Sequence, residues 1–217
     1  QTRTGHAGDP RLALGHETGS RWRSDMNHAL PVVYLVRHAD TAWTLTGQHT
    51  GRTDLPLTEQ GEQQARALGP TLTALRIDRV LSSPLQRARR TAELAMPHAR
   101  VEADDDLMEW DYGAYDGRRT AEIEVERPGW RLFRDGCPGG ETLDSVGART
   151  DAVIGRIRAG GGTVLLFGHR EVLRILAVRW IGLAPIEGRR LLLATASLSV
   201  LGYDHDLTEP AIHTWNT

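Results

Sequence analysis

The chain has 217 residues and a mass of 24.0 kDa, a size that suits one domain with a sizeable core. Its formal net charge is −2, so no basic excess is present to neutralise a nucleic-acid backbone, and no nucleic-acid partner is expected. All 26 Lys and Arg side chains are arginine. The lack of lysine in the sequence excludes Schiff-base chemistry and the phosphate-binding lysine of P-loop proteins.

The single cysteine and the apolar runs bear on the compartment. Cys137 lies in a turn-rich loop over residues 135–140, and the sequence has no second cysteine for an internal disulfide. Nothing indicates an oxidising compartment, so we expect a cytoplasmic location, with Cys137 as a bystander. No apolar run approaches the ~18 residues of a membrane span, and no membrane partner is expected.

Residues 1–31 differ in composition from the rest of the chain. Gly, His, Arg, Ser, Thr and Asp dominate, and residues 12–14 form the only short apolar cluster. We expect a flexible N-terminal extension or a tag, followed by a catalytic domain over residues 32–217. If the extension is ordered, its expected role is packing against a neighbouring subunit, which leaves a homodimer open.

The first predicted elements alternate between strand and helix. In chain order the pattern predicts a strand at 32–36, a polar loop at 44–56, a helix at 58–76, a strand at 78–82, a helix from 84 to about 96 and a strand at 101–103. Thr58 is a fair N-cap for the first helix, and Pro84 suits the first turn of the second.

A polar, aromatic-bearing insert over residues 104–162 separates these elements from the second buried strand, and its first part, about 104–140, is expected to form a small cap. The pattern then predicts helices at 118–126 and 141–160, a strand at 163–167, a helix through 173–181 and closing strands at 196–203 and 211–215. Alternating strands and helices predict an α/β fold, a three-layer α/β/α sandwich with a mainly parallel sheet.

Two buried strands each end in a histidine. His38 follows the strand at 32–36, and His169 follows the strand at 163–167. Carboxyl ends of parallel strands share one edge of the sheet, so both are expected in one pocket with Arg37, Ser83 and Arg87. Two arginine forks and the N-terminus of the helix that begins near Ser83 would suit a phosphate group. The alternative is that a histidine after a strand is merely structural.

The whole pattern resembles the histidine phosphatase superfamily, also called phosphoglycerate-mutase-like. The matching segments run from Val32 to the C-terminus in the family's order: Arg37-His38-Ala39-Asp40-Thr41, residues 51–58, residues 82–92, residues 109–117 and Gly168-His169. The resemblance implies that His38 becomes phosphohistidine, that Glu109 is the general acid, and that Arg37, Arg87 and His169 complete the phosphate pocket. It also implies a metal-independent reaction without a cofactor.

Glu109 and two departures from the family pattern carry alternatives. Without the resemblance, Glu109 is interpreted as one more surface carboxylate in an acidic stretch. If it is the general acid, Met108 and Trp110 beside it could desolvate its carboxyl group and raise its pKa. Thr44 stands where the family often has Asn, and Arg170 stands where Gly is common after the second histidine. Neither change removes a catalytic group, so we do not expect this chain to be a catalytically inactive member of the family.

Residues 109–117 and 130–137 resemble the branch that contains sedoheptulose-bisphosphatase-like sugar phosphatases. We expect a metal-independent phosphomonoesterase that acts on a small phosphorylated metabolite, a sugar phosphate. The expected substrate-binding residues are Thr44, Thr50, Gly51, Ser83, Tyr112 and Arg174. The alternatives are a phosphoglycerate mutase, a phosphate-binding interaction module and a phosphoprotein phosphatase.

Overall fold

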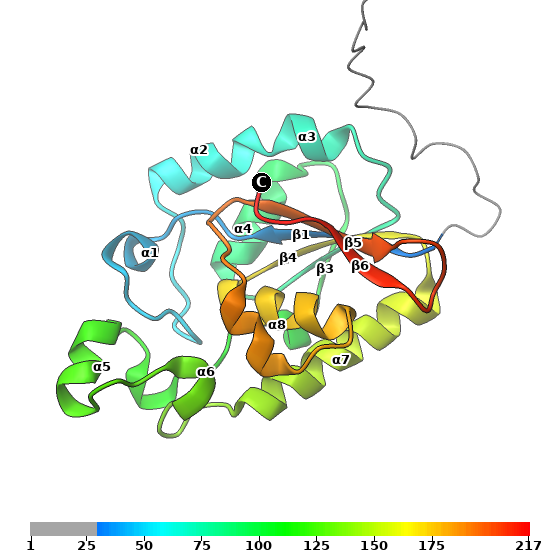
Figure 1. Ribbon diagram of the computed structural model, residues 1–217. Coiled ribbons are helices and arrows are strands. Elements are labelled where there is room, and N and C mark those ends of the chain that lie inside the picture. The colour runs from blue at the N-terminus through cyan, green and yellow to red at the C-terminus, as the bar shows by residue number, and fades with distance from the viewer. Residues whose placement is uncertain (1–29) are drawn as a thin grey trace, which may run out of the picture.

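The computed structural model describes residues 30–217, which fold around a six-stranded sheet (Figure 1). The strands are β1 (Val32–Arg37), β2 (Arg79–Ser82), β3 (Val101–Ala103), β4 (Thr163–Gly168), β5 (Leu198–Tyr203) and β6 (Pro210–Thr214), in the spatial order β3-β2-β4-β1-β5-β6. The first four are parallel to one another, whereas β5 pairs antiparallel with β1 and β6 with β5. The expected mainly parallel α/β sheet is confirmed, and of the two closing strands only β6 lies at the edge.

Helices cover both faces of this sheet, which gives the three layers (Figure 1). On one face lie α2 (Glu59–Ala67), α3 (Gly69–Thr73) and α4 (Gln86–Ala95), and on the other lie α7 (Leu143–Gly160) and α8 (Arg170–Trp180). The strands supply both layers because successive side chains of a strand point to opposite faces. In β4, Leu165 and Phe167 pack with Leu72 and Ala92, whereas Leu166 packs with the α7 and α8 residues.

The helix boundaries follow local chemistry. Thr58 is the N-cap of α2, and its side chain accepts a hydrogen bond from the backbone N–H of Gly61. The single helix predicted for residues 58–76 is wrong, because Pro70 lacks an N–H donor and divides it into α2 and α3. The α4 helix begins at Gln86, two residues after the predicted first turn at Pro84.

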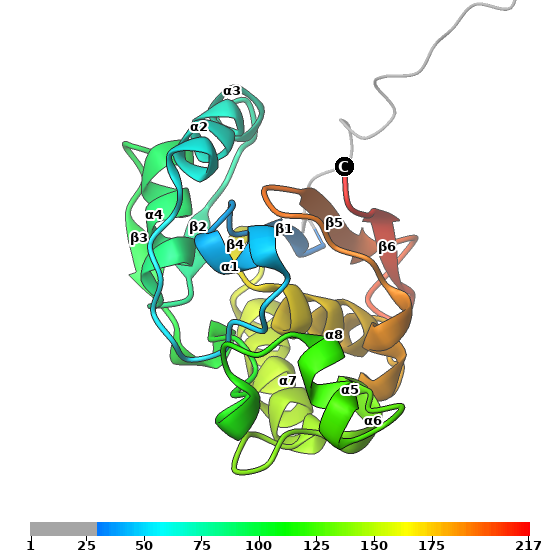
Figure 2. The ribbon, with the colours of Figure 1, turned by 90° about the vertical axis from the view of Figure 1, so that its left-hand side faces the viewer.

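The segment between β3 and α7 forms a small layer of its own. It holds α5 (Thr120–Glu126), α6 (Leu132–Asp135) and the 3₁₀ turns η1 (Asp105–Leu107) and η2 (Gly113–Tyr115). Its apolar cluster, which includes Trp110, Ile123 and Trp130, packs against Val146 of α7 and Ile175 of α8. Figure 2, seen from the side of α1 (Ala42–Thr46), shows α5 and α6 on the same side of the sheet as α7 and α8.

Two short helices lie where the sequence predicted none: α1, in the stretch predicted as polar loop, and α6, a single turn. The 3₁₀ turn η3 (Pro185–Arg190) connects α8 to β5. Within residues 30–217 no helix is long and apolar enough to cross a membrane. Residues 1–29 lie outside the described part of the chain, so the expectations for this part of the N-terminal extension stay predictions.

Candidate active site

The register of two neighbouring strands brings His38 and His169 together. Arg37 of β1 pairs with Gly168 of β4, so each histidine is the next residue after a paired position. The backbone N–H of His38 donates to the carbonyl oxygen of Gly168 at 2.9 Å. The ring centroids lie 5.1 Å apart, and both side chains are buried. The convergence predicted from the strand ends is therefore present.

Hydrogen bonds assign the tautomer of His38. Its Nδ1 lies 2.8 Å from the carbonyl oxygen of Ala39, so Nδ1 carries the proton and Nε2 keeps its lone pair. Burial lowers the pKa of His38 well below its usual value, and the charges of Arg87 and Arg37 lower it further. The imidazole is thus neutral and fixed in orientation, the state that a nitrogen nucleophile needs.

His169 has the opposite tautomer. Its Nδ1 accepts from the Nε–H of Arg87 at 3.1 Å, so Nε2 carries the proton and donates to Oγ of Ser83 at 2.8 Å. Burial, then Arg87, then His38 lower the pKa of His169 well below its usual value. Ser83 follows β2 and is fully buried. Its Oγ contacts His169 in the structure, and the expected contact of Ser83 with substrate stays a prediction.

Arg87 is fully buried, and most of its donors already have partners. Besides the bond to His169, its Nη groups donate to the carbonyl oxygens of Thr50, Gly51 and Thr53 at 3.3, 2.8 and 3.0 Å. The sequence predicted that the planar fork of Arg87 binds phosphate, and this stays a prediction. In the structure Arg87 orients His169 and fixes the loop that holds Thr50 and Gly51, and its charge lies beside His38.

Arg37 keeps a free donor. Its Nη1 donates to the carbonyl oxygen of Leu193 at 2.7 Å, whereas its buried Nε has no hydrogen-bond partner. Burial, together with the charge of Arg170, lowers the pKa of Arg37 to about 10, which still leaves the guanidinium charged at neutral pH. A buried, unpartnered donor on a charged side chain is costly unless an anion arrives to accept from it. Arg37 is therefore the arginine best placed to bind phosphate.

The helix N-terminus at the site belongs to α8 rather than α4. The first N–H of α4, from Gln86, donates to Oδ1 of Asp54 at 2.7 Å, so it is not available to a phosphate as the sequence predicted. The N–H groups of Glu171 and Val172 at the start of α8 both donate to the carboxylate of Glu109, each at 3.1 Å. The partial positive charge of a helix N-terminus thus faces Glu109.

Glu109 is buried, not a surface carboxylate, with 3% of its surface exposed. Burial raises its pKa, and the negative charge of Glu171 raises it further. Backbone N–H bonds from Trp110 and Glu171 and the charge of Arg87 act in the opposite direction. The net direction is upward, which favours a carboxyl group that is protonated for part of the time, as a general acid requires.

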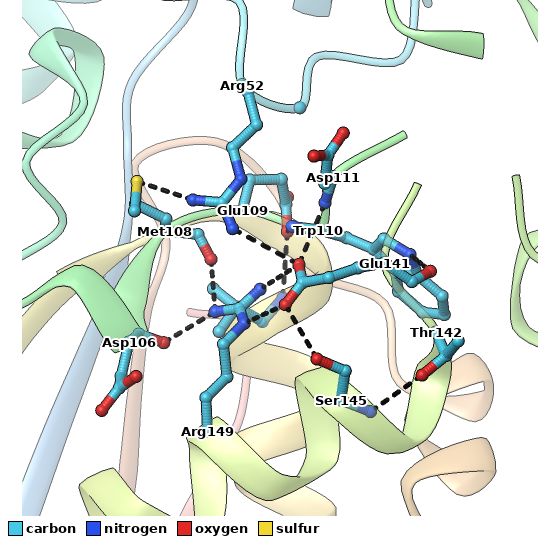
Figure 3. Close-up of polar contacts among 12 residues, drawn as sticks. Arg52, Asp106, Met108, Glu109, Trp110, Asp111, Glu141, Thr142, Ser145 and Arg149 are labelled. Carbon is cyan, nitrogen blue, oxygen red and sulfur yellow. Dashed lines mark hydrogen bonds and ion pairs between the residues drawn. The ribbon is translucent and has the colours of Figure 1, made fainter. Parts of the chain in front are cut away.

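An ion pair clamps the chain on both sides of Glu109 (Figure 3). Arg149 of α7 donates to the carbonyl oxygens of Asp106 and Met108 at 2.7 and 2.6 Å. The carboxylate of Glu141 accepts from Arg149 at 2.8 Å and from the backbone N–H of Asp111 at 3.1 Å. Sequence reasoning missed both clamp residues, because nothing in the local pattern links α7 to the residues around 109.

The remaining predicted substrate residues have varied surroundings. The hydroxyl of Thr44 belongs to the capping box of α1 with Thr41. Tyr112 is buried, and its ring lies 4.9 Å from that of His49. Arg174, which alone would read as a helix surface charge, is also buried and forms an ion pair with Glu171.

Two further groups bear on metal and thiol chemistry. Within residues 30–217, one group of three side chains has ligand atoms within 4.8 Å of one another: Asp204, His205 and Glu209, all exposed in the β5–β6 connection. Sequence reasoning did not single it out. Burial raises the pKa of the Cys137 thiol to about 12, so this side chain stays protonated and unreactive.

Comparison with known proteins agrees with this geometry. The family model of the histidine phosphatase superfamily (branch 1) matches residues 33–217. An acid phosphatase of Mycobacterium tuberculosis is 36% identical over 190 residues, 86% of this chain and 92% of the relative. A sedoheptulose 1,7-bisphosphatase of Saccharomyces cerevisiae is 37% identical over 186 residues, 70% of this chain and 68% of the relative.

A solved structure of the product of the open reading frame Rv3214 from M. tuberculosis superposes with a TM-score of 0.80 at 34% identity. It covers 88% of this chain and 97% of its own. The chain belongs to the histidine phosphatase superfamily, branch 1. It is a phosphatase, a phosphoric monoester hydrolase, as the resemblance implied.

Proposed function

We propose that the protein hydrolyses a small phosphorylated metabolite, a sugar phosphate, through a phosphohistidine on His38. One observation supports this most directly: the hydrogen bond from Nδ1 to the Ala39 carbonyl leaves Nε2 of a neutral imidazole free. In the first step Nε2 bonds to phosphorus, and the bond from phosphorus to the ester oxygen breaks. Glu109 gives its proton to the departing oxygen.

In the second step Glu109 acts as a base. The carboxylate takes a proton from water, the water oxygen bonds to phosphorus, and the phosphorus–nitrogen bond breaks, which restores both residues. Positive charge compensates the transferring phosphoryl group throughout. Arg37 supplies its free Nε–H and Arg87 its charge, and the Nε2–H of His169 exchanges Ser83 for a phosphoryl oxygen. No step requires a metal ion or a cofactor.

The sugar-phosphate assignment draws on the relatives. The yeast relative is named for a sugar bisphosphate, and the mycobacterial relative is named only as an acid phosphatase. We extend the class, and not the particular sugar, to this chain. A cytoplasmic location and a homodimer stay predictions from the sequence.

The test combines a substrate screen with chemical trapping. Wild-type protein and His38→Ala are assayed by kcat/KM against p-nitrophenyl phosphate and a panel of sugar phosphates, and denatured reaction mixtures are analysed for acid-labile phosphohistidine. We expect turnover and a trapped phosphoryl group on His38 in the wild type alone. Turnover by His38→Ala would overturn the mechanism.

The same assay separates the alternatives. A mutase would convert 3-phosphoglycerate faster than it releases phosphate, and its rate would depend on a bisphosphate cofactor. An interaction module would bind phosphate without turnover. A phosphoprotein phosphatase would prefer phosphopeptides to every sugar phosphate in the panel.

A further inference from the structure

A cavity of about 460 Å³ lies beside the candidate active site, between α6, α8 and η3. Glu171 lines it and also bonds through its backbone N–H to the carboxylate of Glu109. Arg170, another lining residue, directly follows His169 in the chain. The cavity therefore adjoins the start of α8, the segment that also binds Glu109 and follows His169.

Its lining is strongly cationic. One carboxylate, that of Glu171, faces five arginines: Arg131, Arg134, Arg170, Arg174 and Arg189. Three of these arginines have close carboxylate partners. Arg174 pairs with Glu171, Arg134 donates through two nitrogens to Asp135, and Arg131 pairs with Glu124.

The other two arginines have donors to spare. Arg170 lies 3.6 Å from Glu171 and makes no side-chain hydrogen bond within residues 30–217. Arg189 is exposed and has neither an ion pair nor a side-chain hydrogen bond in the described part of the chain. Arg189 therefore keeps its planar fork free, and Arg170 has only the 3.6 Å ion pair to Glu171, so both can offer donors to carboxylate or phosphate oxygens.

The rest of the cavity suits a carbon skeleton. Trp130, Leu132 and Phe133 contribute apolar surface, and His49 and Thr120 contribute polar edges. Arg174 lies over the ring of Phe133 at 5.0 Å from its centroid, so the cationic and apolar parts are continuous. A ligand with a short polar chain that ends in an anion would match both parts.

Resting on the function proposed above, we propose that this cavity binds a second anionic group of the same substrate, with Arg170 and Arg189 as its ligands. The preferred substrates are then metabolites with two anionic groups, one the phosphate that His38 attacks and the other a phosphate or a carboxylate. A substrate without the second group leaves Arg189 unpaired and Arg170 with only its ion pair to Glu171, and it loses the charge-assisted hydrogen bonds that the second anion would accept.

The test uses matched substrates. The carboxylate pair is 3-phosphoglycerate and glycerol 3-phosphate, which differ by a carboxylate in place of a hydroxymethyl group. The phosphate set is fructose 1,6-bisphosphate with fructose 1-phosphate and fructose 6-phosphate. For each set the readout is the ratio of kcat/KM for the doubly anionic substrate to kcat/KM for its singly anionic partner. A larger ratio in the carboxylate pair identifies the second anion as a carboxylate, and a larger ratio in the fructose set identifies it as a phosphate.

The variants are Arg189→Gln and Arg170→Gln, and the matched control is Arg190→Gln. Arg190 is an exposed neighbour of Arg189 that pairs with Glu187 and does not line the cavity. We expect each cavity variant to lower the ratio about tenfold, the effect of one charge-assisted hydrogen bond. Because the readout is a ratio, a general loss of folded protein or of chemistry cancels.

Either of two results would overturn this inference while the proposed phosphatase function stands. One is that the wild type hydrolyses all members of each set equally well. The other is that the cavity variants keep the wild-type ratio. If the wild type releases phosphate from no substrate in either set, nor from any other phosphomonoester, the proposed function itself is wrong.

Discussion

The two halves of the candidate active site are held in different ways. His38 and His169 follow adjacent parallel strands, so the ladder between β1 and β4 sets their separation. Glu109 lies in an irregular segment between η1 and η2, where no ladder fixes it. Its position depends on the N-terminus of α8 and on the clamp of Glu141 and Arg149.

This difference indicates which half of the site keeps its geometry when a single side chain is removed. A strand ladder distributes its support over many backbone bonds, and removal of one side chain leaves it intact. The acid side depends on an ion pair whose side chains are only 10% and 15% exposed. Breaking one partner of such a pair leaves the other charge poorly solvated, so that the segment it clamps loses its position.

The largest effect is expected on the histidine side. His38→Ala should lower kcat/KM at least a thousandfold on every phosphomonoester, because it removes the nucleophile. The ladder should hold, so the melting temperature should change little. His98→Ala, at an exposed histidine, is the control and should keep full activity. A His38→Ala protein that unfolds would show that the histidine rings, and not the strands, hold this half together.

Glu109→Gln should lower kcat/KM about 10²- to 10⁴-fold on sugar phosphates, the usual contribution of a general acid. With p-nitrophenyl phosphate, whose leaving group needs no proton, the first step should remain fast. Stopped-flow traces should then show a burst of nitrophenolate followed by slow turnover. The acid role also predicts that the wild-type rate declines at alkaline pH as Glu109 loses its proton, and that this decline is absent in Glu109→Gln. Equal losses on both substrate types would argue against the acid role.

Arg149→Met should lower kcat by about tenfold to a hundredfold with little change in KM, because it releases the segment around Glu109 without touching the phosphate pocket. Arg149→Lys should restore part of the activity. Arg156→Met is the matched control: Arg156 is also on α7, but it contacts the side chains of Asp104 and Asp106 and not the backbone beside Glu109. Equal losses for Arg149→Met and Arg156→Met would contradict the clamp.

The smallest expected effect is on stability as a function of pH. Burial holds the pKa of His38 and of His169 below the value of about 6.5 in the unfolded chain. Below pH 6.5 the unfolded state therefore binds protons that the folded state does not, and the free energy of unfolding should fall as the pH is lowered from 7 to 5. Urea titrations would measure the slope, which His169→Asn should reduce. An unchanged slope would mean that His169 does not contribute.

The sequence predicted the histidine side well for a physical reason. Two short apolar runs that end in His38 and His169 are visible without tertiary information, and parallel pairing brings strand ends to one edge. Arg37 and Arg87 were found in the same way, as neighbours of strand and helix ends. The partners of Arg87 were not, because three carbonyl oxygens of a distant loop are not visible in a side-chain pattern.

The acid side was predictable only in part. Glu109 itself came from family resemblance, since its local sequence reads as an acidic surface. Its clamp joins residues from η1, the loop before α7 and α7, and only the folded chain brings them together. The first N–H of α4, which the sequence offered to phosphate, was misjudged for the same reason, because Asp54 comes from a separate loop to accept the hydrogen bond from Gln86.

The hydrogen bonds between Glu109 and the start of α8 also affect when the carboxyl group of Glu109 is protonated. In the free protein two helical N–H groups and the Trp110 N–H stabilise the ionised carboxylate. A phosphate that arrives beside it adds negative charge at close range and raises the pKa of the carboxyl group further. Binding of the substrate therefore favours protonation of Glu109, and cleavage of the substrate then uses this proton.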